Sequence, residues 1–265
     1  MATQWQTEFD DVIKTGPFAI RFPRKGDLNQ DEEWCEVEID GEWRRVRFHD
    51  YDEVYDIPGL YETIFYRTLR CNSPTVVAGL LQQVLTEQGV DPTGLRVLDV
   101  GAGNGMVGEA LHNLGSRHII GIDLLPEAER AARRDRPWVY NEYFATDLTQ
   151  LKAEEIQALE AARLNLLATV AALGFGDIPP EAFRNAFNFI EDGGFAAFNI
   201  KEDFLRGDHD SPFARLIHNM TEHGVIQMEM YKRYCHRLSI AGEPLYYIAV
   251  IAQKMSDAPE SLLET

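Results

Sequence analysis

Apolar residues recur along the chain in two patterns, one typical of buried strands and one of amphipathic helices. Short apolar runs that end at glycine or an acid predict strands, which we place at residues 97–100, 119–123, 143–148, 164–171 and 195–200. Apolar residues at helical spacing predict helices, which we place at residues 73–85, 106–114, 153–163 and 180–190. Two further β-rich segments, 228–238 and 244–253, come last. Strands that alternate with helices indicate βαβ units.

The first part of the chain shows a different pattern, in which apolar and polar residues alternate on either side of an Asp-Gly pair at 40–41. Asp-Gly between alternating segments is a strong signal for a hairpin with a two-residue turn. The expected register places Glu36 opposite Arg45 and Trp34 opposite Arg47, which are favourable cross-strand pairs. We interpret this side of the hairpin as a solvated face and not as a phosphate-binding surface.

A segment dense in tyrosine and acid follows the hairpin. We expect a helix to begin near Gly59 and to carry Leu60, Ile64 and Leu69 inward. The change of pattern divides the chain into an N-terminal extension that contains the hairpin (residues 1–71), a main domain (72–254) and a polar tail (255–265) that we expect to be mobile.

Residues 97–105 read Val-Leu-Asp-Val-Gly-Ala-Gly-Asn-Gly, a buried strand that runs directly into a glycine-rich turn. Glycine has no Cβ and tolerates positive φ, so such a turn lets a ligand touch the backbone. The helix that follows offers free N–H donors at its amino end. Asp99 stands in a strand that is otherwise apolar, so we expect it to need a partner, either a cationic ligand group or backbone N–H donors.

The glycines allow two interpretations of the cofactor. Residues 103–108, Gly-Asn-Gly-Met-Val-Gly, match the dinucleotide fingerprint G-x-G-x-x-G, a weak signal on its own. In a dinucleotide site, however, the first glycine comes directly off the strand, and here that glycine is Gly101. Counting from Gly101 puts Met106 where the third glycine belongs.

At these residues the chain resembles the class I S-adenosylmethionine (SAM)-dependent methyltransferases. Their first motif is a hydrophobic pair, an acid, a hydrophobic residue and then G-x-G-x-G, and residues 97–105 match every position. In that family an acid that ends the second strand holds the ribose, and another after the third strand lies near the adenine amino group. Asp123 and Asp147 stand at these places. The resemblance implies SAM as the cofactor and an α/β fold with a Rossmann-like sheet of seven strands, mostly parallel with an antiparallel last strand. It also implies that the N-terminal extension, with its hairpin, supplies a helical lid over SAM and substrate.

The resemblance also implies a set of SAM-binding residues, which come from the glycine loop and from the ends of the next three strands. They are Asp99, Gly101, Ala102, Gly103, Asn104, Gly105, Asp123, Leu124, Thr146, Asp147, Leu148 and Ala171. Two of the acids have a structural alternative. Asp99 can be a hydrogen-bonded acid without a ligand, and Asp147 can cap the segment that follows it.

The residues that act on the methyl acceptor are harder to predict, because methyl transfer depends mainly on the orientation of the reactants. Where the acceptor must lose a proton, a histidine or carboxylate can take it. The candidates for catalysis are His236, Glu202 and Tyr61. The candidates for substrate binding are Tyr66, Phe175, Tyr234 and Arg237. Four of them have a structural alternative: a hydrogen-bonded strand residue for His236, an ion pair for Arg237, and packing for Tyr61 and Tyr66.

The composition of the chain limits the kinds of binding partner and metal site that we expect. The chain has 265 residues and a formal net charge of −18, which disfavours nucleic acid and anionic membranes as partners. Its three cysteines, Cys35, Cys71 and Cys235, form no C-x-x-C pair, so we predict neither a zinc site nor any other metal site. The start of the chain lacks the basic and apolar regions of a signal peptide, and no run is long enough to span a bilayer. We therefore expect a cytoplasmic protein.

Motifs of methyltransferases that act on macromolecules are missing from their expected places. Base-amine methyltransferases carry N/D-P-P-Y/F after the fourth strand, where residues 171–174 read Ala-Ala-Leu-Gly. Cytosine-carbon methylation uses a Pro-Cys nucleophile, and no cysteine follows a proline here. Protein-arginine methylation uses two glutamates after the fourth strand, and residues 171–177 contain none. By elimination, we expect a small-molecule acceptor.

The sequence therefore predicts a SAM-dependent methyltransferase that acts on an oxygen, nitrogen or sulfur atom of a small molecule. Two alternatives stay open, a non-catalytic SAM-binding regulatory protein and an NAD(P)-dependent oxidoreductase. The sequence carries no prediction of the oligomeric state.

Overall fold

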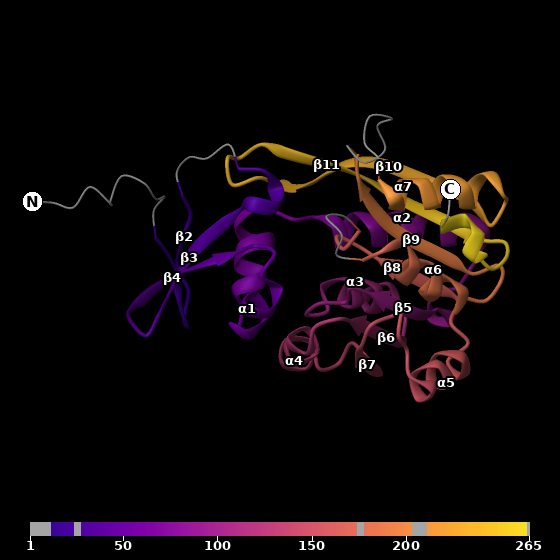
Figure 1. The fold of residues 1–265 in the computed structure, drawn as a ribbon, viewed down its shortest axis with the longest axis horizontal. Helices are drawn as coiled ribbons and strands as arrows, with labels where there is room; N and C mark the ends of the chain where they lie inside the picture. Colours follow the sequence, from indigo (N-terminus) through magenta and orange to yellow (C-terminus); the bar gives the residue numbers. More distant parts are fainter. Residues whose placement is uncertain (1–11, 24–27, 174–177, 203–210, 264–265) are drawn as a thin grey trace, which may run out of the picture. The chain divides into compact units, whose positions relative to one another are not determined.

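The computed structural model describes residues 12–23, 28–173, 178–202 and 211–263, which form two compact units (Figure 1). Unit 1 contains the described residues up to Cys71 together with Cys235–Leu245. Unit 2 contains those from Asn72 to Tyr234 and those from Tyr246 onward. Unit 1 thus includes, besides the N-terminal extension, a short segment that the sequence-based division assigns to the main domain.

Unit 2 is built on a seven-stranded sheet in the order β10-β11-β9-β8-β5-β6-β7. The strands are β5 (Arg96–Val100), β6 (His118–Asp123), β7 (Glu142–Ala145), β8 (Leu166–Thr169), β9 (Phe195–Lys201), β10 (Ile226–Leu238) and β11 (Pro244–Lys254). Strands β7, β6, β5, β8 and β9 pair in parallel, and β11 pairs with β9 in the antiparallel direction. The predicted α/β fold with a mostly parallel seven-stranded sheet is confirmed.

Helices cover both faces of this sheet because its strands are apolar on both sides. The helices are α2 (Ser73–Gln88), α3 (Met106–Leu114), α4 (Pro126–Asp135), α5 (Ala153–Ala161), α6 (Pro180–Asn188) and α7 (Pro212–Glu222), with short 3₁₀ turns at Pro92–Gly94 and Glu260–Leu263. One core joins α2 and α3 to the face that carries Val97, and the other joins α5, α6 and α7 to the face that carries Leu98 and Val100.

The strand order places the carboxyl ends of β5 and β8 at the centre of one sheet edge. From β5 the chain continues outward through β6 and β7, whereas β8 and β9 follow on the other side of β5. Ligands of open α/β sheets bind beyond the strand ends at such a change of direction. The loops after β5 and β8 are therefore expected to flank the binding site.

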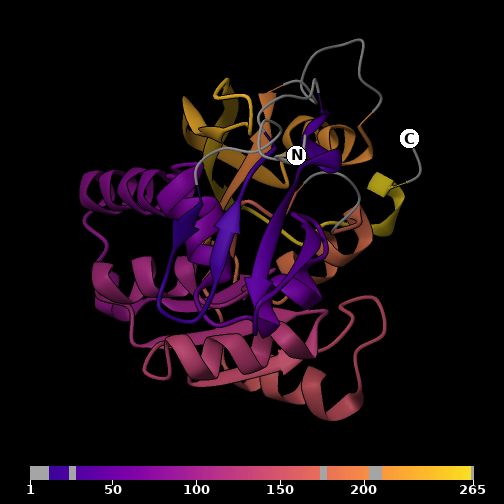
Figure 2. The same ribbon diagram turned by 90° about the vertical axis from the view of Figure 1, so that its left-hand side faces the viewer.

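Unit 1 contains a four-stranded antiparallel sheet in the order β1-β2-β3-β4, drawn in indigo in Figure 2. Its strands are β1 (Ile13–Lys14), β2 (Ala19–Arg21), β3 (Trp34–Ile39) and β4 (Glu42–Arg47), with a 3₁₀ turn at Gln30–Glu32. Asp40 and Gly41 have φ of 54° and 84°, as a two-residue hairpin turn requires. The predicted pairs, Glu36 with Arg45 and Trp34 with Arg47, are confirmed.

The tyrosine-rich segment of unit 1 forms the helix α1 (Tyr51–Asp56) and then a π-helical turn, Glu62–Thr68. Leu60 and Ile64 are fully buried, and Leu69 nearly so, so the inward face predicted for a helix near Gly59 is confirmed. The π-helical geometry is visible in the bond from the Leu69 N–H to the Ile64 carbonyl (3.0 Å). Among the described residues of the whole chain, no helix has the length and apolar character needed to cross a membrane.

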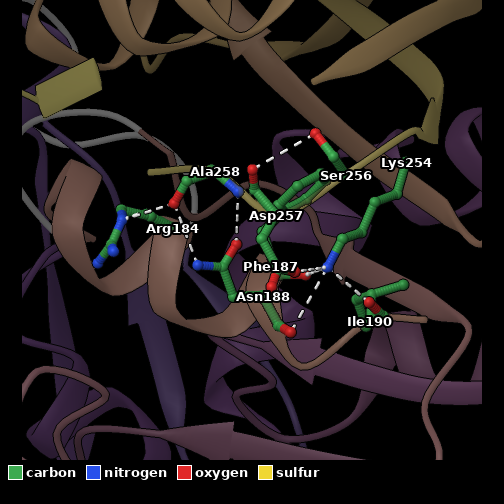
Figure 3. A network of polar contacts seen from close by, with 8 residues as sticks. All are labelled: Arg184, Phe187, Asn188, Ile190, Lys254, Ser256, Asp257 and Ala258. Carbon is green, nitrogen blue, oxygen red and sulfur yellow. Dashed lines mark hydrogen bonds and ion pairs between the residues drawn. The ribbon is translucent and has the colours of Figure 1, made fainter. Parts of the chain in front are cut away.

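The segment after β11 does not stand apart as the expected tail, at least over its described part up to Leu263 (Figure 3). Ala258 and Leu262 are buried in the core beside α6 and α7. The buried Lys254 ammonium donates to the Phe187 and Ile190 carbonyls at 3.2 and 2.6 Å, where a helix carboxyl end favours a cation. Burial of these two apolar residues holds a polar-looking segment in place.

Candidate functional site

The glycine loop lies at the carboxyl ends of β5 and β6. Gly101, Gly103 and Gly105 all have positive φ, at 68°, 54° and 92°. The Gly101 and Ala102 N–H groups donate to the Ile122 carbonyl at 2.9 and 3.1 Å. The loop thus crosses over the end of β6 before α3 begins, in a backbone path that side chains other than glycine rarely adopt.

Asp123, the last residue of β6, is bonded to this loop. One of its carboxylate oxygens accepts from the Gly103 N–H (2.9 Å) and the other from the Leu125 N–H (3.1 Å). Burial raises the pKa of Asp123, and these backbone donors act against the rise. Each carboxylate oxygen has more than one acceptor position, so the half-buried side chain can also accept the two hydroxyls of a ribose. The neighbouring Leu124 is 64% exposed and offers an apolar surface beside it.

Asp99 is fully buried and finds its partner within the protein. The Tyr140 hydroxyl donates to its carboxylate at 2.8 Å. Burial raises the pKa of Asp99 to about 7, while the Tyr140 bond lowers it and the nearby Asp123 charge raises it. The structure thus realises the alternative of a hydrogen-bonded acid. The donor is a tyrosine, which the sequence analysis did not identify.

Two tyrosines, Tyr140 just before β7 and Tyr143 within it, support the loop and pack edge-to-face with centroids 5.2 Å apart. The Tyr143 hydroxyl donates to the Gly103 carbonyl at 2.8 Å. A Cβ on Gly108 would lie 2.6 Å from the Tyr140 hydroxyl, and one on Gly121 would lie 2.7 Å from the Tyr143 ring. Gly108 therefore makes room for Tyr140, which explains the third glycine of the dinucleotide fingerprint without a dinucleotide.

The turn into α3 is held by Arg136, another residue that the sequence analysis did not identify. Its guanidinium donates to the Asn104 carbonyl (3.1 Å) and pairs with Glu109 (2.9 Å). Arg136 and Asn104 are both buried. No local sequence motif indicates the role of Arg136. The tyrosines have a weak signal in the sequence, namely Gly121 within β6 and the spacing of Tyr140 and Tyr143.

Asp147 follows β7 and caps a turn. One of its oxygens accepts from both the N–H and the hydroxyl of Thr149, each at 2.8 Å. These bonds lower the pKa of Asp147, the backbone bond most. The Thr146 N–H donates to the Asp123 carbonyl at 2.8 Å, so the end of β7 lies beside the end of β6. Leu148 is buried. The capping alternative is thus present, and Asp147 remains half-exposed.

The loop after β8 contacts the glycine loop directly. A Cβ on Gly101 would lie 2.6 Å from that of Ala172. Ala171 has a positive φ of 60°, and its N–H donates to the side-chain oxygen of Asn199 at 2.7 Å. The structure therefore brings Ala171, the glycine loop and the ends of β6 and β7 to one edge of the sheet.

The remaining candidates in unit 2 have structural partners. Glu202, just beyond β9, accepts from Arg233 at 2.9 Å. Tyr234 is buried and its hydroxyl lies 2.6 Å from the Ser73 hydroxyl. Phe175 lies outside the described residues. Glu202 lies at a strand end beyond which ligands bind, whereas Tyr234 belongs to a buried network.

In unit 1, Arg237 is 2% exposed and pairs with the equally buried Glu33 at 2.6 Å. This ion pair is the structural alternative for the arginine, and the buried guanidinium is already neutralised. His236 is buried with its Nδ1 3.9 Å from the Cys71 sulfur. Burial and the Arg237 charge lower the pKa of His236 to about 3, so it is neutral and a weak base at pH 7.

Tyr61 and Tyr66 belong to an aromatic cluster of unit 1. The Tyr61 ring packs on Phe65, Tyr55 and Tyr66 with centroids 4.8, 5.1 and 6.0 Å apart. Both rings are half-buried, so packing and an exposed aromatic edge coexist. Among the described residues, no three or more His, Cys, Asp or Glu side chains are grouped to hold a metal ion.

Comparison with known proteins identifies the central part of the chain. Residues 98–198, which hold the glycine loop, Asp123, Asp147 and Ala171, match the family model described as "Methyltransferase domain". The chain contains a methyltransferase domain. With the strand order and the glycine-loop motif, this domain has the class I, Rossmann-like fold of the SAM-dependent methyltransferases. No match is found among curated proteins.

Solved methyltransferase structures are similar to this chain at low sequence identity. The N-methyltransferase NodS from Bradyrhizobium japonicum WM9, in complex with S-adenosyl-L-homocysteine (SAH), is 16% identical over 78% of this chain and 97% of its own, with a TM-score of 0.52. Magnesium protoporphyrin IX methyltransferase from Synechocystis PCC 6803 with bound SAM is 12% identical over 68% and 79%, with a TM-score of 0.46. Ribosomal protein L11 methylase from Lactobacillus delbrueckii subsp. bulgaricus is 18% identical over 68% and 78%, with a TM-score of 0.44.

Proposed function

We propose that this methyltransferase transfers the methyl group of SAM to an oxygen, nitrogen or sulfur atom of a small molecule. The observation that carries the proposal is the group formed by the positive-φ glycine loop, the half-buried Asp123 bonded to it at 2.9 Å and the exposed Leu124. In this proposal Asp123 holds the ribose hydroxyls, Leu124 covers the adenine and Asp147 accepts from the adenine amino group. The glycine loop and Ala171 flank the methionine part.

SAM supplies a sulfonium whose methyl carbon is electrophilic, so that the acceptor forms its bond to this carbon as the carbon–sulfur bond breaks and SAH leaves. The protein contributes orientation and exclusion of water, which are worth up to roughly 7–11 kcal/mol. A hydroxyl, thiol or protonated amine must also lose a proton. We propose Glu202 as the acceptor of that proton, because it stands at the end of β9 and is a carboxylate held by Arg233.

The small size of the acceptor is supported by charge and by missing motifs. The net charge of −18 repels nucleic acid phosphates, and the loop after β8 lacks the sequence motifs of base-amine and protein-arginine methyltransferases. The neighbour NodS is described as an N-methyltransferase, which fits a nitrogen acceptor among the three atoms. The NAD(P) alternative loses its main support, because Gly108 is required by the Tyr140 ring.

The test is a transfer assay with methyl-labelled SAM and a panel of small alcohols, amines and thiols, analysed by mass spectrometry. We expect SAH to form together with a labelled product from at least one class, and Glu202→Gln to slow the reaction. Label in added RNA or protein instead would overturn the small-molecule acceptor. Tight SAM binding with no turnover across the panel would favour the regulatory alternative.

A further inference from the structure

A buried polar network in unit 2 ends at the loop after β8. Asn199 of β9 is fully buried, and its side-chain nitrogen donates to the Tyr234 hydroxyl at 2.6 Å and to the Ser73 hydroxyl at 3.2 Å. The two hydroxyls lie 2.6 Å apart. The side-chain oxygen of Asn199 accepts from the Ala171 N–H at 2.7 Å. Residues from α2, β9 and β10 thus fix one backbone amide.

That amide belongs to a residue in an unfavourable conformation. Ala171 has a φ of 60°, in the left-handed region that residues with a Cβ rarely occupy. Such conformations persist where the surroundings impose them, and they gather at functional sites. The bond from the Ala171 N–H to the Asn199 side-chain oxygen (2.7 Å) holds this N–H toward β9 and so favours that conformation.

The strained residue lies next to the part of the site that holds the methyl donor. Ala172 lies close to Gly101, because a Cβ added to Gly101 would lie 2.6 Å from the Ala172 Cβ. The buried Thr169 hydroxyl donates to the Val100 carbonyl at 2.9 Å, which joins the ends of β8 and β5. These two strand ends flank the change of direction in the sheet, where ligands bind.

We propose that Asn199, with Tyr234 and Ser73 orienting its amide, is a positioning residue for the methyl donor. The network holds Ala171 in its left-handed conformation and so keeps the loop after β8 against the glycine loop. Without the Asn199 bond, Ala171 relaxes to negative φ, and bound SAM must restore the loop at the expense of affinity. This inference rests on the proposed function, because it assumes that SAM occupies the site.

Isothermal titration with SAH, the product form of the donor, tests the proposal. We expect Asn199→Ala to weaken SAH binding about tenfold, a factor set by the penalty of the left-handed conformation. Ala171→Gly removes that penalty, so it should recover most of the lost affinity in the Asn199→Ala background, with the Ala171→Gly single variant as the reference for that comparison. A merely structural role for Asn199 gives no such rescue.

Asn165 supplies a matched control at the opposite end of the strands. Its side-chain oxygen accepts from the Arg96 N–H at 2.7 Å and its nitrogen donates to the Gly94 carbonyl at 3.1 Å. Asn165→Ala should leave SAH affinity within about twofold of the wild type. If Asn199→Ala does not fold, Tyr234→Phe removes only one hydroxyl and should weaken binding about threefold.

Two outcomes overturn the proposal: SAH affinity that is unchanged in Asn199→Ala or in Tyr234→Phe, and a loss that Ala171→Gly does not recover. If the wild-type protein itself does not bind SAH, the proposed function fails first, so the two failures are distinguishable. A rescue confined to the Asn199→Ala background, with the Asn165→Ala control unaffected, supports the positioning role.

Discussion

The residues predicted for the methyl donor and those predicted for the methyl acceptor are held in different ways. In unit 2 the donor residues are held by bonds from backbone N–H groups to side-chain oxygens, with Asp123 accepting from Gly103 and Leu125 at 2.9 and 3.1 Å and Asn199 accepting from Ala171 at 2.7 Å. In unit 1 two of the predicted acceptor residues, Arg237 and His236, are buried and have partners within that unit. Arg237 is neutralised by Glu33 at 2.6 Å, and His236 is buried with a pKa of about 3.

This difference follows from what each function demands of the chain. Donor binding uses the backbone, so it requires glycine at positive φ and acids at strand ends, which leave a fixed spacing in the sequence. Acceptor binding uses side chains whose types also serve ion pairs and cores. A histidine or arginine in a strand therefore carries little information until its neighbours in space are known.

The largest expected effect concerns Asp123. If Asp123 accepts from both ribose hydroxyls as proposed, Asp123→Ala removes two hydrogen bonds, each worth roughly 1.5–3 kcal/mol when the acceptor is charged. SAH affinity should therefore fall by roughly a hundredfold or more, as measured by isothermal titration. Asp123→Asn keeps one acceptor oxygen, so its SAH affinity should lie between that of the wild type and that of Asp123→Ala. Unchanged affinity in Asp123→Ala would show that the donor side is misassigned.

The next effect tests the opposite side of the comparison. Arg237→Met leaves the buried Glu33 carboxylate without its charged partner, which costs about 3–5 kcal/mol. The free energy of unfolding should fall by that amount in denaturant titration, while SAH affinity of the folded protein stays within about twofold. Adding Glu33→Gln should recover much of the stability. A loss of activity toward the acceptor without a loss of stability would instead make Arg237 a substrate-binding residue.

A pH experiment tests whether the buried Asp99 holds a proton in the folded protein. The pKa of Asp99 is raised from about 4 to about 7, so the folded protein holds its proton more tightly than the unfolded chain. This contribution to stability is fully present below about pH 4 and is lost as the pH rises through about 7. The full range is on the order of 4 kcal/mol.

Asp99→Asn removes this titration. The difference in unfolding free energy between Asp99→Asn and the wild type should grow in favour of the variant from pH 5 to pH 8. Tyr140→Phe, which removes the hydroxyl that favours the charged carboxylate, should raise the pKa of Asp99 further and extend the pH dependence to higher pH. A difference that is constant with pH would mean that Asp99 stays ionised throughout.

The smallest effect belongs to Asp147. If it accepts one hydrogen bond from the adenine amino group, Asp147→Ala should lower SAH affinity by up to about tenfold. Asp91 is a matched control, because it caps a similar turn through the Thr93 N–H at 2.9 Å at the start of β5. Asp91→Ala should leave SAH affinity unchanged. Equal affinities for the two variants would assign Asp147 to capping alone.

Much of the fold follows from local patterns. The helix expected at residues 106–114 has the bounds Met106–Leu114, and the hairpin register around Asp40 is as expected. What could not be predicted depends on contacts between distant residues. The Tyr140 bond to Asp99 spans 41 positions and the Asn199 bond to Ala171 spans 28. The π-helical turn at Glu62–Thr68 could not be predicted either, because no periodic pattern in its sequence indicates it.

The central claim is that the glycine loop binds SAM, and titration of the wild-type protein with SAH and with NADH tests it most directly. Bound SAH should also protect Gly101, Gly103 and Leu124 from amide hydrogen exchange. We predict saturable one-to-one binding of SAH and no binding of NADH at the same concentrations. Binding of NADH without binding of SAH would contradict the account.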